Sequence, residues 1–212
     1  MASCQCQGIE ETFSRKAVTK ELARYRQKGP ELTTRMLVEA LKAAGIRGAT
    51  LLDIGGGVGA IQHELLAAGA VQATDVDASW AYLEAAEEEA RRRHLAGRIQ
   101  FAHGNFVDLA PQIPPAEVVT LDRVICCFDD MERLVDLSAA RAEKLYGLVY
   151  PRDAWWAKFF VAVLNLIQRI QGSPFRSFVH PTQAVEGLVQ RRGLKRRYYR
   201  RTLVWQVAVY SR

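Results

Sequence analysis

Hydrophobic positions along the chain follow two different periods, and the two periods alternate. Short runs rich in apolar residues have the length of buried strands. Each run leads into a longer segment whose apolar residues recur three or four positions apart, the spacing of an amphipathic helix. The expected strands are 51–54, 71–76, 98–102, 118–121 and 148–150, and the expected helices among them are 61–68, 80–94 and 129–145. Such alternation predicts an α/β fold built on a mostly parallel sheet.

Both ends of the chain depart from this alternation. Before the first strand, segments 10–28 and 30–44 have helical spacing and are separated by Gly29-Pro30, while residues 1–8 read as a loose tail. We expect these helices either to lie over the mouth of a cofactor site or to pack on the sheet. At the other end, two strand-like runs with a turn near Thr202 predict a closing antiparallel hairpin.

Segment 154–170 is the most apolar helical stretch of the sequence. Its large side chains occupy more than one helical face, with Lys158 and Arg169 as interruptions. It is too short and too charged to span a membrane comfortably. Three interpretations are open: a buried helix, a lid over a bulky apolar substrate, or an interfacial patch. Burial is the interpretation that we favour. A break at Gly172-Ser173-Pro174 follows, and His180-Pro181 opens one more helix that ends near Gly193.

The first strand runs straight into the glycine cluster of segment 51–60, LLDIGGGVGA. Glycines there let a ligand approach the backbone, and the first N–H groups of the following helix face that ligand. Gly55, Gly57 and Ala60 fit the dinucleotide-binding pattern G-x-G-x-x-G/A. Asp53, Gly55, Gly57 and Gly59 also spell D-x-G-x-G-x-G, and in this the sequence resembles the class I S-adenosylmethionine (SAM)-dependent methyltransferases.

Charge favours the second interpretation of the glycine cluster. A carboxylate at Asp53 would repel a bound pyrophosphate, whereas SAM carries an ammonium and a sulfonium and no phosphate. We therefore expect Asp53, Gly55, Gly57 and Gly59 to bind SAM.

An acidic residue follows the second strand, where a ribose-containing cofactor needs an acceptor for its hydroxyl groups. Asp77 and Asp75 both lie in this region. Segment 73–79 resembles the methyltransferase pattern with Asp77 in register, which implies that Asp77 binds the ribose. The alternative is that Asp77 helps to cap the next helix, a role that Ser79 could also fill.

After the third strand comes His103-Gly104-Asn105-Phe106. This stretch resembles the family's loop in which an Asp or Asn meets the adenine amine and an apolar neighbour packs on the ring. The resemblance assigns those roles to Asn105 and Phe106. Asn105 could equally be a turn residue.

Asp122 stands at the carboxyl end of the fourth strand, where ligands of open α/β sheets bind. We expect it to border the cofactor and to orient an acceptor amine or hydroxyl. Tyr25 and His180 are candidate general bases, if the reaction needs one. Simpler roles are preferred for all three: a packing Tyr, a lone loop His, and a strand-end Asp bonded to backbone N–H groups.

Composition and charge narrow the function classes. The chain has 212 residues, ordinary soluble composition and a net charge of +6, which predicts one domain. Arginines crowd into 91–98 and 191–201 without a nucleic-acid motif, so a solvated basic surface is expected. The pairs Cys4/Cys6 and Cys126/Cys127 do not have zinc-site spacing, and no metal is expected. The polar N-terminus and the lack of a spanning segment predict a cytoplasmic protein.

The resemblance covers residues 45–210 and implies a Rossmann-like sheet of seven strands, mostly parallel, with an antiparallel C-terminal strand and helices on both faces. We expect a single domain over 1–212, with helices in 1–45 near the cofactor and a substrate-side helical insertion at 151–193. The implied activity is methyl transfer from SAM to a small, apolar or aromatic molecule. The alternatives are an NAD(P)-binding oxidoreductase and a non-catalytic SAM-binding module. The sequence sets neither the methylated atom nor the oligomeric state.

The C-terminal third is similar to magnesium-protoporphyrin O-methyltransferases, chiefly in the apolar helix and in segment 176–180. Those proteins carry a His shortly after the fourth strand. This chain has Cys126-Cys127-Phe128 there instead, so no catalytic role is transferred to that position. We expect both cysteines to be small buried hydrophobic residues.

Overall fold

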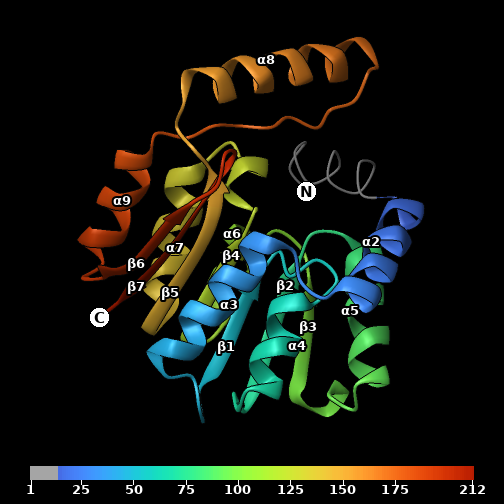
Figure 1. Ribbon diagram of the computed structural model, residues 1–212, viewed down its shortest axis with the longest axis vertical. Helices are drawn as coiled ribbons and strands as arrows, with labels where there is room; N and C mark the ends of the chain where they lie inside the picture. Colours follow the sequence, from blue (N-terminus) through green and yellow to red (C-terminus); the bar gives the residue numbers. More distant parts are fainter. Residues whose placement is uncertain (1–13) are drawn as a thin grey trace.

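The computed structural model describes residues 14–212, so the tail predicted at 1–8, the pair Cys4/Cys6 and the start of the helix predicted at 10–28 lie outside the described residues. A twisted seven-stranded sheet forms the centre of the molecule (Figure 1). The strands are β1 (Thr50–Ile54), β2 (Gln72–Asp77), β3 (Ile99–His103), β4 (Ala116–Asp122), β5 (Ala142–Pro151), β6 (Lys195–Arg201) and β7 (Trp205–Ser211).

The sheet has the order β3-β2-β1-β4-β5-β7-β6. Strands β1 to β5 pair in parallel, whereas β7 is antiparallel to both β5 and β6. The β6–β7 turn closes at Thr202, whose N–H donates to the carbonyl of Trp205 at 2.8 Å. The predicted Rossmann-like sheet with an antiparallel C-terminal strand is confirmed.

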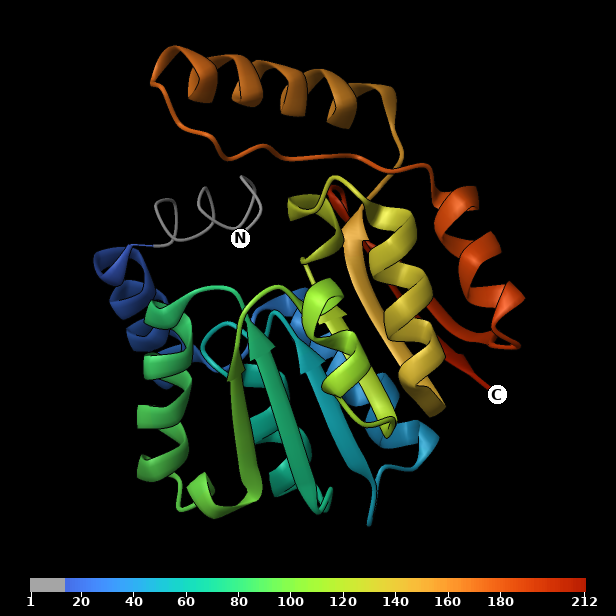
Figure 2. The same ribbon diagram turned by 180° about the vertical axis from the view of Figure 1, so that it is seen from behind.

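Helices cover both faces of the sheet (Figures 1 and 2). They are α2 (Arg15–Lys28), α3 (Leu32–Ala44), α4 (Ala60–Ala67), α5 (Trp80–Arg92), α6 (Phe106–Leu109), α7 (Met131–Arg141), α8 (Trp155–Ile170) and α9 (Thr182–Arg191), with single 3-10 turns η1 (Ala96–Arg98), η2 (Ala110–Gln112) and η3 (Ile125–Cys127). Apolar side chains of α3, α4 and α5 form the core on one face. Those of α6, α7 and α9 form the core on the other face.

Helix α3 packs closely on the sheet because β5 has a glycine at the point of contact. A Cβ atom on Gly147 would lie 2.8 Å from Leu37 Cδ1, well inside van der Waals contact. Leu37 and Leu41 are fully buried there. Of the two roles expected for this helix, the structure therefore shows packing on the sheet.

Strand β5 is longer than the pattern predicts. It begins at Ala142, directly after α7 ends at Arg141, whereas the helix was expected to continue to 145. Leu145 falls on helical spacing from Leu134, which made the pattern ambiguous. The sheet decides the outcome, because Ala142 already pairs with Ala116 of β4 and Leu145 pairs with Ser211 of β7.

The favoured interpretation of segment 154–170 is wrong. It forms α8, which stands away from the sheet and is connected back to α9 by an extended segment that runs beneath it (Figures 1 and 2). Only Ala157 of this helix is buried. No helix within residues 14–212 has both the length and the apolar composition needed to cross a lipid bilayer.

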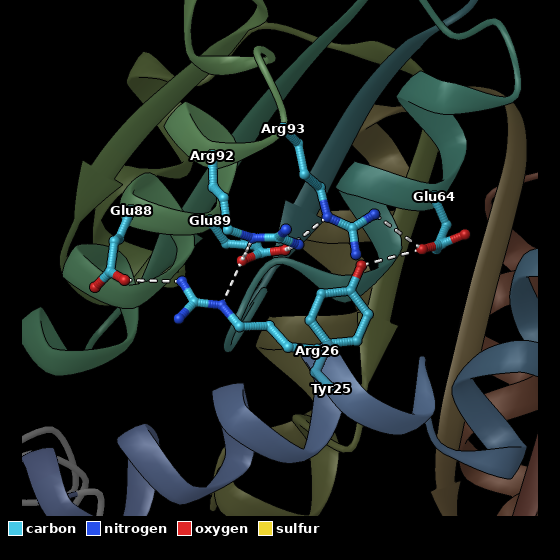
Figure 3. A network of polar contacts seen from close by, with 7 residues as sticks. All are labelled: Tyr25, Arg26, Glu64, Glu88, Glu89, Arg92 and Arg93. Atoms are coloured by element: carbon cyan, nitrogen blue, oxygen red, sulfur yellow. Dashed lines mark hydrogen bonds and ion pairs between the residues drawn. The ribbon is translucent and has the colours of Figure 1, made fainter.

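A buried carboxylate joins α2 to α5 (Figure 3). The side chain of Glu89 is fully buried and accepts hydrogen bonds from Arg26 Nε (2.8 Å), Arg92 Nη2 (2.5 Å) and Arg93 Nε (2.7 Å). Burial alone would raise the pKa of Glu89, but the hydrogen bonds from the three guanidinium groups outweigh it and hold this pKa well below its usual range. Arg93 also pairs with Glu64 of α4, so the network fixes three helices together.

We predict that Glu89→Gln lowers the free energy of unfolding by about 1–3 kcal/mol, because the buried network loses its negative charge and one of its two acceptor oxygens. Urea unfolding at pH 7 measures this change. Since the folded-state pKa of Glu89 is depressed, its stabilisation is complete above the ordinary pKa of Glu and is lost as the pH falls below it. The difference between wild type and variant should therefore shrink from pH 7 towards pH 3.

Glu88→Gln is the matched control, because Glu88 is exposed and pairs with Arg26. We expect it to change the unfolding free energy by less than about 1 kcal/mol. Equal effects of the two substitutions at pH 7 would contradict the role given to Glu89.

Candidate active site

A cavity of about 420 Å³ opens at the carboxyl ends of β1, β2 and β4. Its walls come from the turn after β1, the ends of β2 and β4, the loop after β3, and the segments that follow β4 and α8. The lining side chains that carry chemistry are Glu21, Thr34, Asp53, Asp77, Tyr82, Asn105, Asp122, Arg123, Cys126 and Cys127. Four of these carry carboxyl groups, and among the lining residues described only Arg123 supplies a positive charge. The cavity therefore favours a cationic ligand.

The turn after β1 needs glycine at two positions that face the cavity. Gly55 and Gly57 have φ values of +66° and +58°, a left-handed conformation that L side chains rarely adopt. A Cβ on Gly55 would lie 2.5 Å from a methyl group of Val124. At Gly57 the nearest atoms lie 3.8 Å away on Tyr82, so the backbone there is open to the cavity.

Gly59 lies outside the cavity lining and begins α4 as its N-cap, with φ +78°. A Cβ at this position would lie 2.5 Å from His63 Cε1. The close packing of α4 therefore requires glycine here, and the contact of Gly59 with SAM stays a prediction. Gly56 lines the cavity.

Asp53 presents a carboxylate oxygen that the described residues leave unpaired. Its side chain is buried at the end of β1, where Oδ1 accepts a hydrogen bond from the Thr120 hydroxyl at 2.7 Å. Oδ2 is buried and has no hydrogen-bond partner among residues 14–212. Burial, reinforced by the charges of Asp122 and Asp77, raises the pKa of Asp53 to about 7, against the opposing hydrogen bond from Thr120. A cationic ligand in the cavity would pair with Oδ2 and would stabilise the charged form of Asp53.

The structure separates the two carboxylates of β2. Asp77 lines the cavity, and it accepts hydrogen bonds from the backbone N–H groups of Gly57 (3.1 Å) and Ser79 (2.8 Å). Asp75 is fully buried beneath the glycine turn and accepts from Gln62 Nε2 at 2.6 Å. Burial raises its pKa well above the usual value. Only Asp77 is placed to reach a ligand, as the register implied. The side chain of Ser79 caps α5.

Asn105 and Phe106 lie together on the wall beyond Asp77. Asn105 is the N-cap of α6: its Oδ1 accepts from the N–H of Val107 at 3.1 Å, and its Nδ2 donates to Asp108 at 3.1 Å. Asn105 is therefore a turn residue, and it also borders the cavity. Phe106 is buried and offers an apolar surface at the same place.

Asp122 is held at the cavity by two neighbours. Thr34 of α3 donates its hydroxyl proton to Oδ2 at 2.5 Å, and Arg123 Nε donates to Oδ1 at 3.2 Å. Arg123 is one of two non-glycine residues in the described chain with positive φ (63°), and it also pairs with Glu31 at the start of α3. Arg24 of α2 binds the other oxygen of Glu31 at 3.1 Å. The two N-terminal helices are thereby tied to the end of β4.

The comparison with known families points the same way as the geometry. Residues 51–145, which contain the glycine turn, Asp77, Asn105 and Asp122, match the family described as a methyltransferase domain. No protein of curated function matches the sequence of the chain.

Solved structures confirm the fold of this domain. Magnesium protoporphyrin IX methyltransferase from Synechocystis PCC 6803, with bound SAH, is similar with a TM-score of 0.74 at 16% identity over 98% of this chain and 99% of that one. An O-methyltransferase family protein from Burkholderia thailandensis is similar with a TM-score of 0.70 at 20% identity, over 97% of this chain and 61% of that one. An O-methyltransferase family 2 protein from Planctomyces limnophilus, solved in complex with apigenin, is similar with a TM-score of 0.60 at 16% identity. This similarity covers 87% of this chain and 62% of that one. The predicted class I methyltransferase fold is confirmed.

Two of the three candidate catalytic residues, Tyr25 and His180, lie outside the cavity lining. Tyr25 is buried outside the cavity, where its hydroxyl donates to Glu64 at 3.1 Å and Arg93 lies over its ring (Figure 3). His180 Nε2 lies 3.1 Å from the carbonyl of Ile125 and 3.0 Å from that of Phe128. Two carbonyls at one nitrogen require that nitrogen to carry the proton. His180 therefore fixes the segment after β4 and does not line the cavity.

Several residues that line the cavity have no role predicted from the sequence. Thr34 and Tyr82 lie on helices whose spacing indicates only which face is buried, and Phe175 comes from the extended segment after α8. No local signal could have placed them at the site. Cys126 is buried as predicted and Cys127 is partly exposed, and both thiols donate to the carbonyl of Arg123.

We predict that Asp77→Asn weakens SAM binding by about 1–3 kcal/mol, or roughly 5- to 150-fold in Kd, because one acceptor for the ribose is lost. Isothermal titration calorimetry measures the change. Asp136→Asn is the control for the loss of one negative charge, because Asp136 lies on α7 outside the cavity and pairs with Arg192. Unchanged affinity in the Asp77 variant would remove Asp77 from the ribose site.

SAM affinity should also rise with pH. The pKa of Asp53 is raised to about 7, so the carboxylate that attracts the SAM ammonium is only fully formed above that pH. We expect Kd to fall roughly tenfold between pH 5.5 and pH 7.5. Asp53→Asn should bind more weakly at pH 7.5 and lose most of this dependence. A variant that keeps the wild-type pH profile would show that another group is responsible.

Proposed function

We propose that this protein transfers the methyl group of SAM to a small, apolar or aromatic molecule. The observation that carries the proposal is the pairing, in one cavity, of an open glycine turn with the unpaired buried oxygen of Asp53. Such a pair suits a ligand that brings a cation to the bare backbone. A cytoplasmic location stays a prediction.

The cofactor half of the cavity offers a partner for each part of SAM. Asp53 would accept from its ammonium, and the backbone of the glycine turn, open at Gly57, would lie against its methionine chain. Asp77 would accept from the ribose hydroxyls. Asn105 and Phe106, further along the same wall, would meet the adenine edge and ring face.

The acceptor half of the cavity is apolar. Phe128, Leu134, Phe175 and Trp205 line it, together with the small thiols of Cys126 and Cys127. These side chains come from four separate segments that meet above the end of β4. A flat or bulky apolar acceptor fits such walls better than a charged one, because a charged group would lose its hydration without a partner.

Bound SAM supplies a methyl group already activated on a sulfonium, so the transfer is an in-line displacement at that carbon. The chain's own contribution is to hold the acceptor in line and to exclude water. Asp122 is proposed to orient an acceptor hydroxyl or amine. Each of its oxygens already accepts one hydrogen bond, from Thr34 or Arg123, and has a lone pair left for a second.

The similar structures support an aromatic acceptor. One is named for magnesium protoporphyrin IX and another was solved with apigenin, and both compounds are built on flat rings. We therefore place tetrapyrroles, flavonoids and quinone-like compounds first among the acceptors to test.

The test is incubation of the purified protein with isotope-labelled SAM and either this panel or a metabolite extract, followed by mass spectrometry. We expect label on an apolar or aromatic product. Asp77→Asn should reduce the yield at low SAM concentration, and the yield should recover at high SAM concentration, because the substitution weakens cofactor binding only. Label on polar metabolites alone would contradict the apolar acceptor.

The two alternative functions predict different results. A non-catalytic SAM-binding module would bind SAM in calorimetry and label no product. An NAD(P)-linked oxidoreductase would show a higher melting temperature with nicotinamide cofactors and no change with SAM. Four carboxyl groups around the cavity count against that alternative, because they repel a pyrophosphate.

A further inference from the structure

Helix α8 presents a wide apolar face to solvent. Its exposed large side chains share one side of the helix and comprise Trp155 (81% exposed), Phe159 (68%), Phe160, Val163, Leu166 (58%), Ile167 and Ile170 (78%). Three of the seven are aromatic. Contiguous exposure of this size on a soluble protein marks a surface that meets a partner.

The opposite side of α8 fixes this orientation. Asn165 Nδ2 donates to the carbonyl of Ser177 at 2.8 Å, and the N–H of Ser177 donates back to Asn165 Oδ1 at 2.9 Å. This reciprocal pair attaches α8 to the extended segment beneath it (Figure 2). The apolar face therefore points away from the sheet and from the cavity, which excludes its use as a lid lining in this conformation.

The β6–β7 hairpin tip adds exposed apolar side chains near the start of α8. Leu203 and Val204 at this tip are 75% and 40% exposed. The backbone N–H of Arg152, two residues before the N-cap of α8, donates to the carbonyl of Val204 at 2.9 Å, and its guanidinium donates to the carbonyl of Leu203. The tip and the Trp155 end of α8 thus lie next to each other.

Positive charge accompanies this surface. Lys158 and Arg169 flank the apolar face of α8, Lys158 in an ion pair with Asp153 at 2.6 Å, and segment 154–172 contains no acidic residue. Residues 154–212 hold eleven Lys and Arg against one acidic residue, whereas residues 1–153 hold eighteen against twenty-two. The exposed residues Arg200 and Arg201 immediately precede the hairpin tip.

We propose that α8 and the hairpin tip dock on the surface of an anionic lipid bilayer. At 16 residues α8 is about 24 Å long, so it would lie in the plane of the interface with its apolar face among the acyl chains and its cations at the headgroups. A second copy of the chain fits less well. A symmetric contact would face this surface with itself, and its cations would meet like charges with no acidic residue of α8 to offset them.

Docking would also bring the cavity close to the lipid. Ser177, which holds α8 through Asn165, lines the cavity, as does the neighbouring Phe175. This consequence rests on the proposed function: an apolar acceptor dissolved in the membrane would be one layer of residues from the site. The docking itself requires no catalytic activity.

Vesicle co-sedimentation tests the proposal. The full chain is mixed with vesicles of phosphatidylcholine alone or of phosphatidylcholine with phosphatidylglycerol. We expect wild type to bind the anionic vesicles, and Phe159→Ser/Leu166→Ser to bind at least tenfold more weakly. Both side chains are exposed, so the variant should melt at the wild-type temperature. Lys158→Gln/Arg169→Gln should bind the anionic vesicles several-fold more weakly.

Leu32→Ser/Val71→Ser is the matched control, since it removes two exposed apolar side chains outside α8 and the hairpin tip (54% and 49% exposed). It should bind vesicles like wild type. The proposal is overturned if wild type binds neither kind of vesicle, or if Leu32→Ser/Val71→Ser loses binding as much as Phe159→Ser/Leu166→Ser does. A dimer in sedimentation equilibrium that Phe159→Ser/Leu166→Ser dissociates, without vesicle binding by wild type, would assign the surface to a second copy.

Discussion

The site depends on a concentration of carboxyl groups around a bare piece of backbone. Parallel strands end at the same edge of the sheet, and β1, β2 and β4 each end in or near an aspartate. Asp53 and Asp77 are buried and Asp122 is partly exposed, and one oxygen of Asp53 has no partner among the described residues. Such an arrangement is unfavourable unless a cation enters. The same constraint favours a sulfonium nucleoside over a pyrophosphate at the glycine turn.

The part of the site that could be predicted from sequence is the part that backbone geometry fixes locally. Gly55 and Gly57 adopt φ values that other residues rarely adopt, so their spacing reports a conformation directly. Asp77 follows from its register at the end of a short strand. At Gly59 a side chain would clash with His63, and spacing cannot distinguish this packing requirement from contact with a ligand.

The remaining features depend on tertiary contacts. Tyr25 and His180 were candidate bases because of their chemistry, and the fold turned one towards Glu64 and the other towards two backbone carbonyls. Thr34 reached Asp122 from a helix with no distinguishing pattern. The apolar content of α8 was read as burial, because composition measures affinity for an apolar environment and does not say whether protein or lipid provides it. The extended segment beneath α8 connects this helix to the cavity wall, because Ser177 bonds to Asn165 and also lines the cavity.

The most direct test of the account is a crystal structure of the chain in complex with S-adenosylhomocysteine. The account predicts the ribose hydroxyls on Asp77, the amino group within hydrogen-bond distance of Asp53, and the amino-acid chain against Gly55 and Gly57. A nucleoside bound away from the glycine turn, or a crevice that stays empty at saturating ligand, would contradict it.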